Sequence, residues 1–165
     1  RLDASLRAIP PNTLARRAGS RALTAPPGLR RDSPGFKSTS YFGAVAAQRA
    51  AKRAGCDEAL FREGGVYVEG ASTGIVAWNG GAPAGLGPGA LPSVTTEAFL
   101  GGRGERRGLR REELLAGALL IGSLTTAAPL VSIDGEECAR PAAMLRACEA
   151  FRERLRTDAA MQKKL

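Results

Sequence analysis

A chain of 165 residues can form one domain with its own core, and its composition of 44% hydrophobic and 24% charged residues is that of a folded globular protein. Because the sequence has no histidine, Ser-His-Asp and Cys-His catalysis and every histidine-containing metal site are excluded. The net charge of +8 suggests an anionic partner, but no arginine cluster is interleaved with aromatic residues, so we do not expect a nucleic-acid-binding protein.

The first half of the chain predicts an irregular beginning, a helix and then strands. Residues 1–36 hold five of the ten prolines and show no sustained period, so we expect a linker there. An Ala-rich helix is predicted between an N-cap at Ser40 and a terminal glycine at Gly55. Two apolar runs around Gly64-Gly65 predict a β-hairpin over residues 59–68. A third strand is predicted over residues 75–78.

The second half predicts a loop, two helices and a strand between them. Residues 80–92 are rich in Gly and Pro and are expected to form a loop. A helix is predicted over 112–120 and a strand over 130–133.

Residues 114–133 carry no charge, but Gly and Pro interrupt them, so we expect no membrane span. A helical stripe of apolar residues is predicted to pack on the domain through Met144, Cys148, Phe151 and Leu155. The fold class is therefore mixed α/β.

The three cysteines lack the spacing of a metal or redox site. Cys56, Cys138 and Cys148 are odd in number and contain no C-x-x-C pair, so we expect no metal site. They are expected to be small buried hydrophobes in a reducing compartment, which favours the cytoplasm.

Lys37 lies in a setting that suits a nucleophile. It follows Pro34-Gly35-Phe36 and precedes Ser38-Thr39-Ser40-Tyr41 at the mouth of the predicted helix. A lysine at the edge of an apolar region can lose its proton through desolvation and attack a carbonyl. Taken alone, a lysine is more often a solvated surface charge.

Four blocks in order resemble the class IV aminotransferases, a family with D-amino acid and branched-chain aminotransferases and aminodeoxychorismate lyase. The blocks are Lys37 to Tyr41 with the following helix and residues 55–60, then residues 68–73, residues 89–95, and residues 122–135. The resemblance implies the large C-terminal domain of the D-amino acid aminotransferase-like fold, over residues 37–165. It also implies pyridoxal phosphate as cofactor, and amino acid and 2-oxo acid substrates.

The resemblance assigns a role to each matching residue. Lys37 would bind the cofactor covalently and move the proton, and Glu69 would face the pyridine nitrogen. Val94 and Thr95, with the hydroxyl of Ser123, would hold the phosphate. Tyr41 would hydrogen-bond the phenolic oxygen, and Leu124 would contact substrate. Four of these residues also have an explanation that involves no cofactor. Glu69 could be a solvated carboxylate, Thr95 and Ser123 could cap turns, and Tyr41 could be a core tyrosine.

The chain departs from the family pattern at several positions. Gly74 stands where an asparagine is usual, Thr96 where an arginine is usual, and the connection over 97–122 is short. The resemblance implies a small N-terminal domain in the family, and we expect the sequence to begin near the interdomain linker, without this domain. The expected function is a homodimeric aminotransferase. The alternatives are a lyase of the aminodeoxychorismate lyase kind and a divergent, non-catalytic member that binds a partner.

Overall fold

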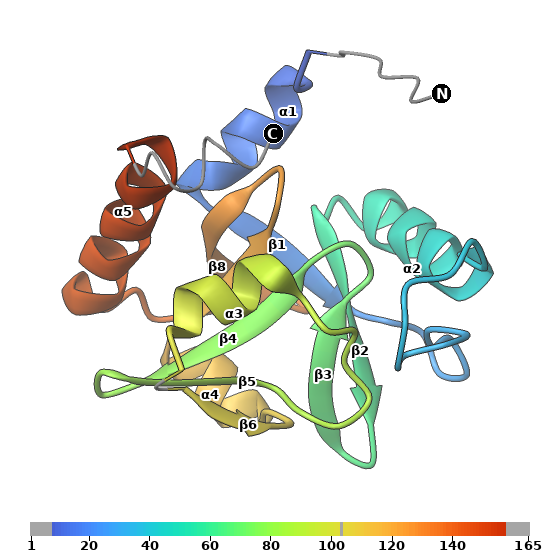
Figure 1. The fold of residues 1–165 in the computed structure, drawn as a ribbon. Helices are drawn as coiled ribbons and strands as arrows, with labels where there is room; N and C mark the ends of the chain where they lie inside the picture. Colours follow the sequence, from blue (N-terminus) through green and yellow to red (C-terminus); the bar gives the residue numbers. More distant parts are fainter. Residues whose placement is uncertain (1–7, 103, 158–165) are drawn as a thin grey trace, which may run out of the picture.

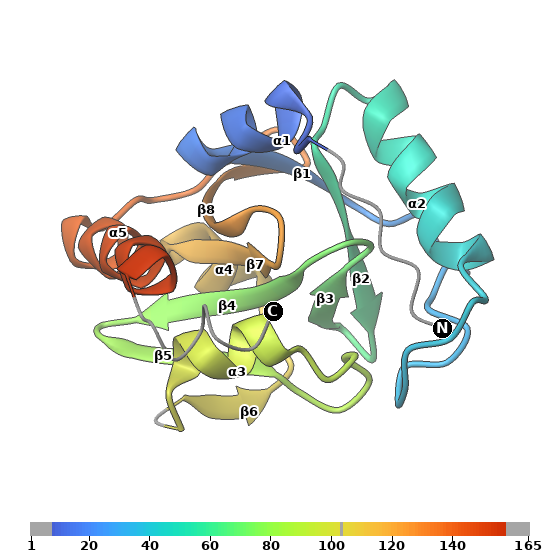
Figure 2. The same cartoon turned by 45° about the horizontal axis from the view of Figure 1, so that its top comes forward.

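Nine strands form a single sheet in the computed structural model, which describes residues 8–102 and 104–157 (Figures 1 and 2). Along the sheet the order is β3-β2-β1-β8-β7-β4-β5-β6, and β9 pairs with β8. The strands are β1 (Ser20–Thr24), β2 (Glu58–Glu63), β3 (Val66–Gly70), β4 (Gly74–Asn79), β5 (Ala82–Leu86), β6 (Glu105–Arg107), β7 (Ala118–Gly122), β8 (Thr126–Ile133) and β9 (Glu136–Glu137). Strand β1 is parallel to both of its neighbours, whereas β7 is antiparallel to β4 and β8.

The two ends of the sheet meet and close it into a barrel. Leu109, just after β6, forms an antiparallel bridge with Tyr67 of β3 through backbone hydrogen bonds of 2.7 and 2.9 Å. This bridge joins β3 to the segment that follows β6, so the two edges of the sheet lie against each other.

Alternate residues of the strands face the two sides of the sheet, as the two-residue period of a strand requires. In β4, Ile75 and Ala77 join the cluster inside the barrel, while Val76 joins the cluster under the outer helices. In β7, Leu120 lies inside and Leu119 outside. Strands β4 and β7 are therefore buried on both faces, which explains their nearly continuous apolar sequence.

In the part of the chain that the structure describes, five α-helices lie outside the barrel, with a short 3₁₀ turn at Arg16–Ala18 (Figure 1). They are α1 (Pro11–Ala15), α2 (Phe42–Arg53), α3 (Val94–Leu100), α4 (Arg111–Ala116) and α5 (Ala142–Thr157). Helix α2 packs small residues, such as Ala47 and Ala51, against β2 and β3. Helix α5 buries Met144, Cys148 and Phe151, so the predicted apolar stripe is confirmed.

Four sequence expectations about elements are wrong in whole or in part. Residues 1–36 are not all irregular, because β1 lies between β2 and β8 and buries Ala22 completely. Residues 80–92 are not all loop, since β5 crosses them despite Pro83. The helix expected over 112–120 ends at Ala116, and Gly117 leads into β7. Helix α2 begins at Phe42 with no side-chain cap, so Ser40 is not its N-cap.

The uncharged stretch over 114–133 forms part of a helix and two strands of the barrel. Within the described residues no helix is long and apolar enough to cross a membrane. Cys138 and Cys148 are buried as expected, whereas Cys56 is partly exposed.

Candidate active site

A pocket of about 600 Å³ opens where four segments of the fold converge. They are the segment that leads into α2, the end of β3 with the turn into β4, the first turn of α3, and the turn between β7 and β8. The lining residues are Arg31, Lys37, Tyr41, Ala44, Val45, Gln48, Glu69, Ala71, Ser72, Thr73, Gly74, Leu91, Pro92, Ser93, Val94, Thr95, Ile121, Gly122 and Ser123.

The pocket gathers residues that lie more than eighty positions apart in the chain. All of the site residues proposed from the sequence line it, with the exception of Leu124. The Leu124 side chain is 56% exposed, and its carbonyl oxygen accepts a hydrogen bond of 2.8 Å from Arg17 Nη2. Leu124 therefore lies beside the pocket, next to Ser123 in the chain.

Lys37 and Tyr41 lie at the open side of the pocket. Both side chains are exposed, and Tyr41 immediately precedes the first residue of α2. Lys37 is therefore in contact with solvent as far as the described residues are concerned. The sequence predicts an apolar surrounding for this lysine, and the described residues do not supply it. Any apolar cover over this lysine has to come from another part of the protein or from a bound molecule.

Glu69 lies on the inner wall and is held on both carboxylate oxygens. Arg31 Nε donates to Oε1 at 2.5 Å, and the backbone amide of Leu91 donates to Oε2 at 3.1 Å. The side chains of Arg31 and Glu69 are only 11% and 5% exposed. Burial raises the pKa of Glu69, and the hydrogen bond and charge of Arg31 act in the opposite direction.

Arg31 is a site residue that the sequence reasoning missed. The Arg30-Arg31 pair stood out only as a charge cluster, for which a solvated face is the usual explanation. Its distance of six residues from Lys37 could have suggested a place near the pocket, but nothing in the sequence links it to Glu69.

Hydroxyl and amide donors also line the pocket. Val94 and Thr95 form the first turn of α3, and Ser123 lies in the β7–β8 turn. The Ser93 hydroxyl caps this helix by accepting from the Thr96 amide at 3.2 Å. The first-turn amides that precede Thr96 have no partner within the helix and can donate to an anion.

The two departures from the family pattern lie in contact with each other. A Cβ atom placed on Gly74 would come within 2.4 Å of Thr96 Oγ1, and Thr96 is completely buried. The Thr96 side chain thus fills the space that a side chain at position 74 would need. Gly74 and Thr96 are therefore a matched pair, and the pocket wall remains closed at this point.

Glu58 holds two residues of the pocket lining in place through hydrogen bonds. Its side chain is fully buried, and its Oε2 accepts hydrogen bonds from Ser72 Oγ at 2.5 Å and Thr73 Oγ1 at 3.1 Å. Ser72 and Thr73 both line the pocket. Burial raises the pKa of Glu58, and these hydrogen bonds lower it by less.

The raised pKa of Glu58 makes stability depend on pH. The folded state binds this proton more tightly than the unfolded chain, so the free energy of unfolding should fall as pH rises above the unfolded value of about 4.3. We expect Glu58→Gln to flatten this fall, as measured by urea unfolding between about pH 4 and pH 7. Glu97→Gln, on an exposed site, is the matched control. An unchanged slope in Glu58→Gln would contradict the assignment.

The sequence matches the family described as Amino-transferase class IV over residues 1–133. The chain belongs to the class IV aminotransferase family. The match covers the four motif blocks up to Ile133, and it extends across the first strand, which the sequence reasoning had taken for a linker. A comparison with curated proteins found no match.

Solved structures of class IV aminotransferases share this fold. A hypothetical aminotransferase from Mycobacterium tuberculosis in its PLP-bound form has a TM-score of 0.78 and 25% identity, over 92% of this chain and 61% of that one. The fold IV-transaminase CpuTA1 from Curtobacterium pusillum has a TM-score of 0.71 and 27% identity, over 84% and 54% of the chains. The branched-chain amino acid aminotransferase of Escherichia coli has a TM-score of 0.70 and 21% identity, over 88% of this chain and 53% of that one. The mixed α/β fold expected from the resemblance is confirmed.

This class IV aminotransferase chain spans little more than half the length of these structures, with 61%, 54% and 53% of them covered.

Proposed function

We propose that the chain is the pyridoxal-phosphate-binding part of an aminotransferase, which moves an amino group between an amino acid and a 2-oxo acid. The observation that carries this proposal is the presence of Lys37 and Glu69 on the walls of one pocket, together with hydroxyl and amide donors. An amine for the aldehyde of the cofactor, a carboxylate for its ring nitrogen and donors for its phosphate are the groups that pyridoxal phosphate requires. The donor set therefore fits this cofactor.

Each residue has one task in this proposal. The Lys37 amine would condense with the cofactor aldehyde and later carry the proton from the substrate α-carbon. Glu69 would accept a hydrogen bond from the protonated ring nitrogen, and Arg31 would hold the carboxylate ionised and aimed. Val94, Thr95 and Ser123 would bind the phosphate. The bound cofactor would supply an electron sink for the substrate carbanion.

Tyr41 would bind the phenolic oxygen of the cofactor from the open side of the pocket. It lies near Lys37 in sequence, and its side chain is 39% exposed, so its hydroxyl is free to meet a bound ring. Leu124, which lies outside the pocket lining, is left as a contact for the more distant part of a substrate.

The open side of the pocket supports the proposal that further protein covers it. Two exposed apolar side chains, Val45 and Val94, line the pocket, and three more follow or precede lining residues in the chain: Phe36, Phe42 and Leu124. Exposed apolar surface near a pocket often marks an interface. We infer that a small domain and a second subunit of a homodimer cover this rim and desolvate Lys37, and that the enzyme works in the reducing cytoplasm, where buried thiols such as Cys148 stay free.

The same residues could also serve a lyase, and a binding protein could keep the scaffold without catalysis. Since Gly74 and Thr96 fit each other, the pocket wall gives no specific support to a degenerate site. The experiment is a single turnover with pyridoxal phosphate and a panel of amino acids. An aminotransferase converts the cofactor to its amine form and releases a 2-oxo acid, whereas a lyase releases pyruvate from aminodeoxychorismate and leaves the cofactor unchanged. A protein that binds no cofactor under any condition would contradict both enzymatic proposals.

A further inference from the structure

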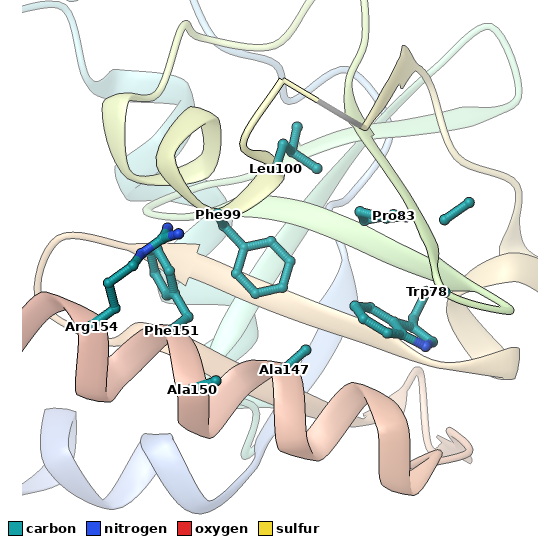
Figure 3. Close-up of a pocket in the computed structure, with 10 residues that line it drawn as sticks. Trp78, Pro83, Phe99, Leu100, Ala147, Ala150, Phe151 and Arg154 are labelled. Carbon is teal, nitrogen blue, oxygen red and sulfur yellow. The ribbon is translucent and has the colours of Figure 1, made fainter.

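A second hollow, of about 550 Å³, lies outside the barrel between the β4–β5 hairpin, the end of α3 and helix α5 (Figure 3). It shares no lining residue with the pocket around Lys37. We call it the α5 groove, and it is lined by Trp78, Gly81, Ala82, Pro83, Phe99, Leu100, Ala147, Ala150, Phe151 and Arg154.

The groove exists because the elements around it are short or carry small side chains. Helix α3 ends at Leu100, and Gly101 and Gly102 follow with φ angles of 58° and 76°, which turn the chain away before another helical turn can form. On α5, the residues that face the hollow between Met144 and Phe151 are Ala147 and Ala150. Their methyl groups leave the space that larger side chains would fill.

The walls of the groove are aromatic. Phe99 and Phe151 pack edge to face, with ring centroids 5.2 Å apart, and Trp78 lies toward the other end of the groove (Figure 3). Trp78 and Phe99 are only partly buried, so their faces remain open to a ligand. An apolar body between these rings would remove hydrophobic surface from water on both sides.

A positive charge closes the end of the groove opposite Trp78. The Arg154 guanidinium lies 5.3 Å from the centre of the Phe151 ring, and its Nη2 donates to the Ala98 carbonyl at 2.6 Å. This bond ties the guanidinium to the end of α3 and uses only one of its five N–H groups. In the ion pairs found within residues 8–102 and 104–157, Arg154 has no carboxylate partner, so its other donors can bind an anion.

The spacing of these groups sets the length of a ligand. Ala147 and Arg154 are two helical turns apart, which is about 10 Å along α5. A molecule that fills the groove would therefore have an extended apolar body and one anionic end.

We propose that the α5 groove is a binding site for apolar monocarboxylates of medium chain length. The aliphatic or aromatic body lies along Ala147 and Ala150 between Trp78 and the two phenylalanines, and the carboxylate accepts hydrogen bonds from Arg154. The binding site does not depend on the function proposed for the Lys37 pocket.

The single tryptophan of the sequence, Trp78, lines this groove and reports on its occupancy. Titration with octanoate is expected to change the tryptophan fluorescence in a saturable way, without added pyridoxal phosphate. Octan-1-ol and octylamine, which have the same apolar chain, are expected to bind roughly tenfold or more weakly because they lack the anion. Equal affinities of the three probes would overturn the role of the charge.

Two substitutions and their controls locate the site. Arg154→Gln should weaken octanoate binding roughly tenfold, whereas Arg146→Gln, on an exposed part of α5, should leave it unchanged. Ala147→Leu should fill the groove and abolish the titration, and Ala142→Leu, also on α5 but outside the groove, should not. Circular dichroism melts check that each variant is folded.

Three outcomes would overturn the proposal: no saturable change at millimolar octanoate, full binding by Arg154→Gln, or full binding by Ala147→Leu. Sedimentation of the free protein tests another occupant. A concentration-dependent dimer that Ala147→Leu abolishes would assign the groove to a second copy of the chain, and it would also contradict the carboxylate site.

Discussion

Lys37→Ala is expected to lower the rate of amino-group transfer by roughly 10²–10⁴-fold, which is the contribution of one positioned acid-base group. The substitution removes the only amine that lines the pocket within the described residues, apart from backbone and guanidinium nitrogens. Because Lys37 is exposed, its loss leaves no buried cavity, and the fold should be retained. The measurement is a single turnover with the best amino acid of the panel, together with a thermal melt.

Lys52→Ala is the matched control for this prediction. Lys52 is an exposed residue in α2 and does not line the pocket, so its removal should change neither rate nor stability. A Lys37→Ala protein that keeps the rate of the unmodified chain would contradict the assignment of Lys37 as the group that moves the proton.

Glu69→Gln is expected to slow the same step about a hundredfold to a thousandfold, while cofactor binding is retained. Glutamine keeps the shape and can still accept from Leu91, but it lacks the negative charge that would hold the ring nitrogen protonated. The prediction separates binding from chemistry, so it is checked by measuring cofactor affinity and single-turnover rate on the same protein. Glu112→Gln, on an exposed carboxylate of α4 outside the pocket lining, should behave like the unmodified protein.

The Arg31→Gln variant tests the direction in which Arg31 shifts the pKa of Glu69. Since Arg31 opposes the rise that burial causes in the pKa of Glu69, its loss should raise that pKa further. Glu69 would then become protonated at a higher pH. The acid limb of the pH–rate profile should therefore shift to higher pH in Arg31→Gln. A shift of this limb to lower pH would contradict the proposed pairing.

Elements with a strong local pattern could be predicted from the sequence. The hairpin over 59–68 has two apolar runs and a Gly-Gly turn, and the stripe on α5 repeats at helical spacing. Strand β1 was missed because prolines surround it and it has only five residues, and its place comes from parallel pairing with β2 and β8. Pairing between distant segments leaves no local pattern in so short a strand.

The site could be predicted to the extent that its residues belong to contiguous motifs. Lys37, Glu69, Thr95 and Ser123 are proposed from their blocks, and all four line one pocket in the structure. The pairing of Arg31 with Glu69 and the contact of Gly74 with Thr96 are tertiary contacts between segments that lie about twenty to forty residues apart in the chain, so no local pattern announces them. The exposure of Lys37 also could not be predicted from the sequence, because the burial of a lysine in a loop depends on which other parts of the protein cover it.

The most direct test of the central claim is borohydride reduction of the protein incubated with pyridoxal phosphate, followed by peptide mapping. If Lys37 holds the cofactor, the reduced label will be fixed on the peptide that contains Lys37 and will disappear in Lys37→Ala. Label on Lys52 in place of Lys37, or an equal distribution over all lysines, would contradict the assignment of this pocket as the cofactor site.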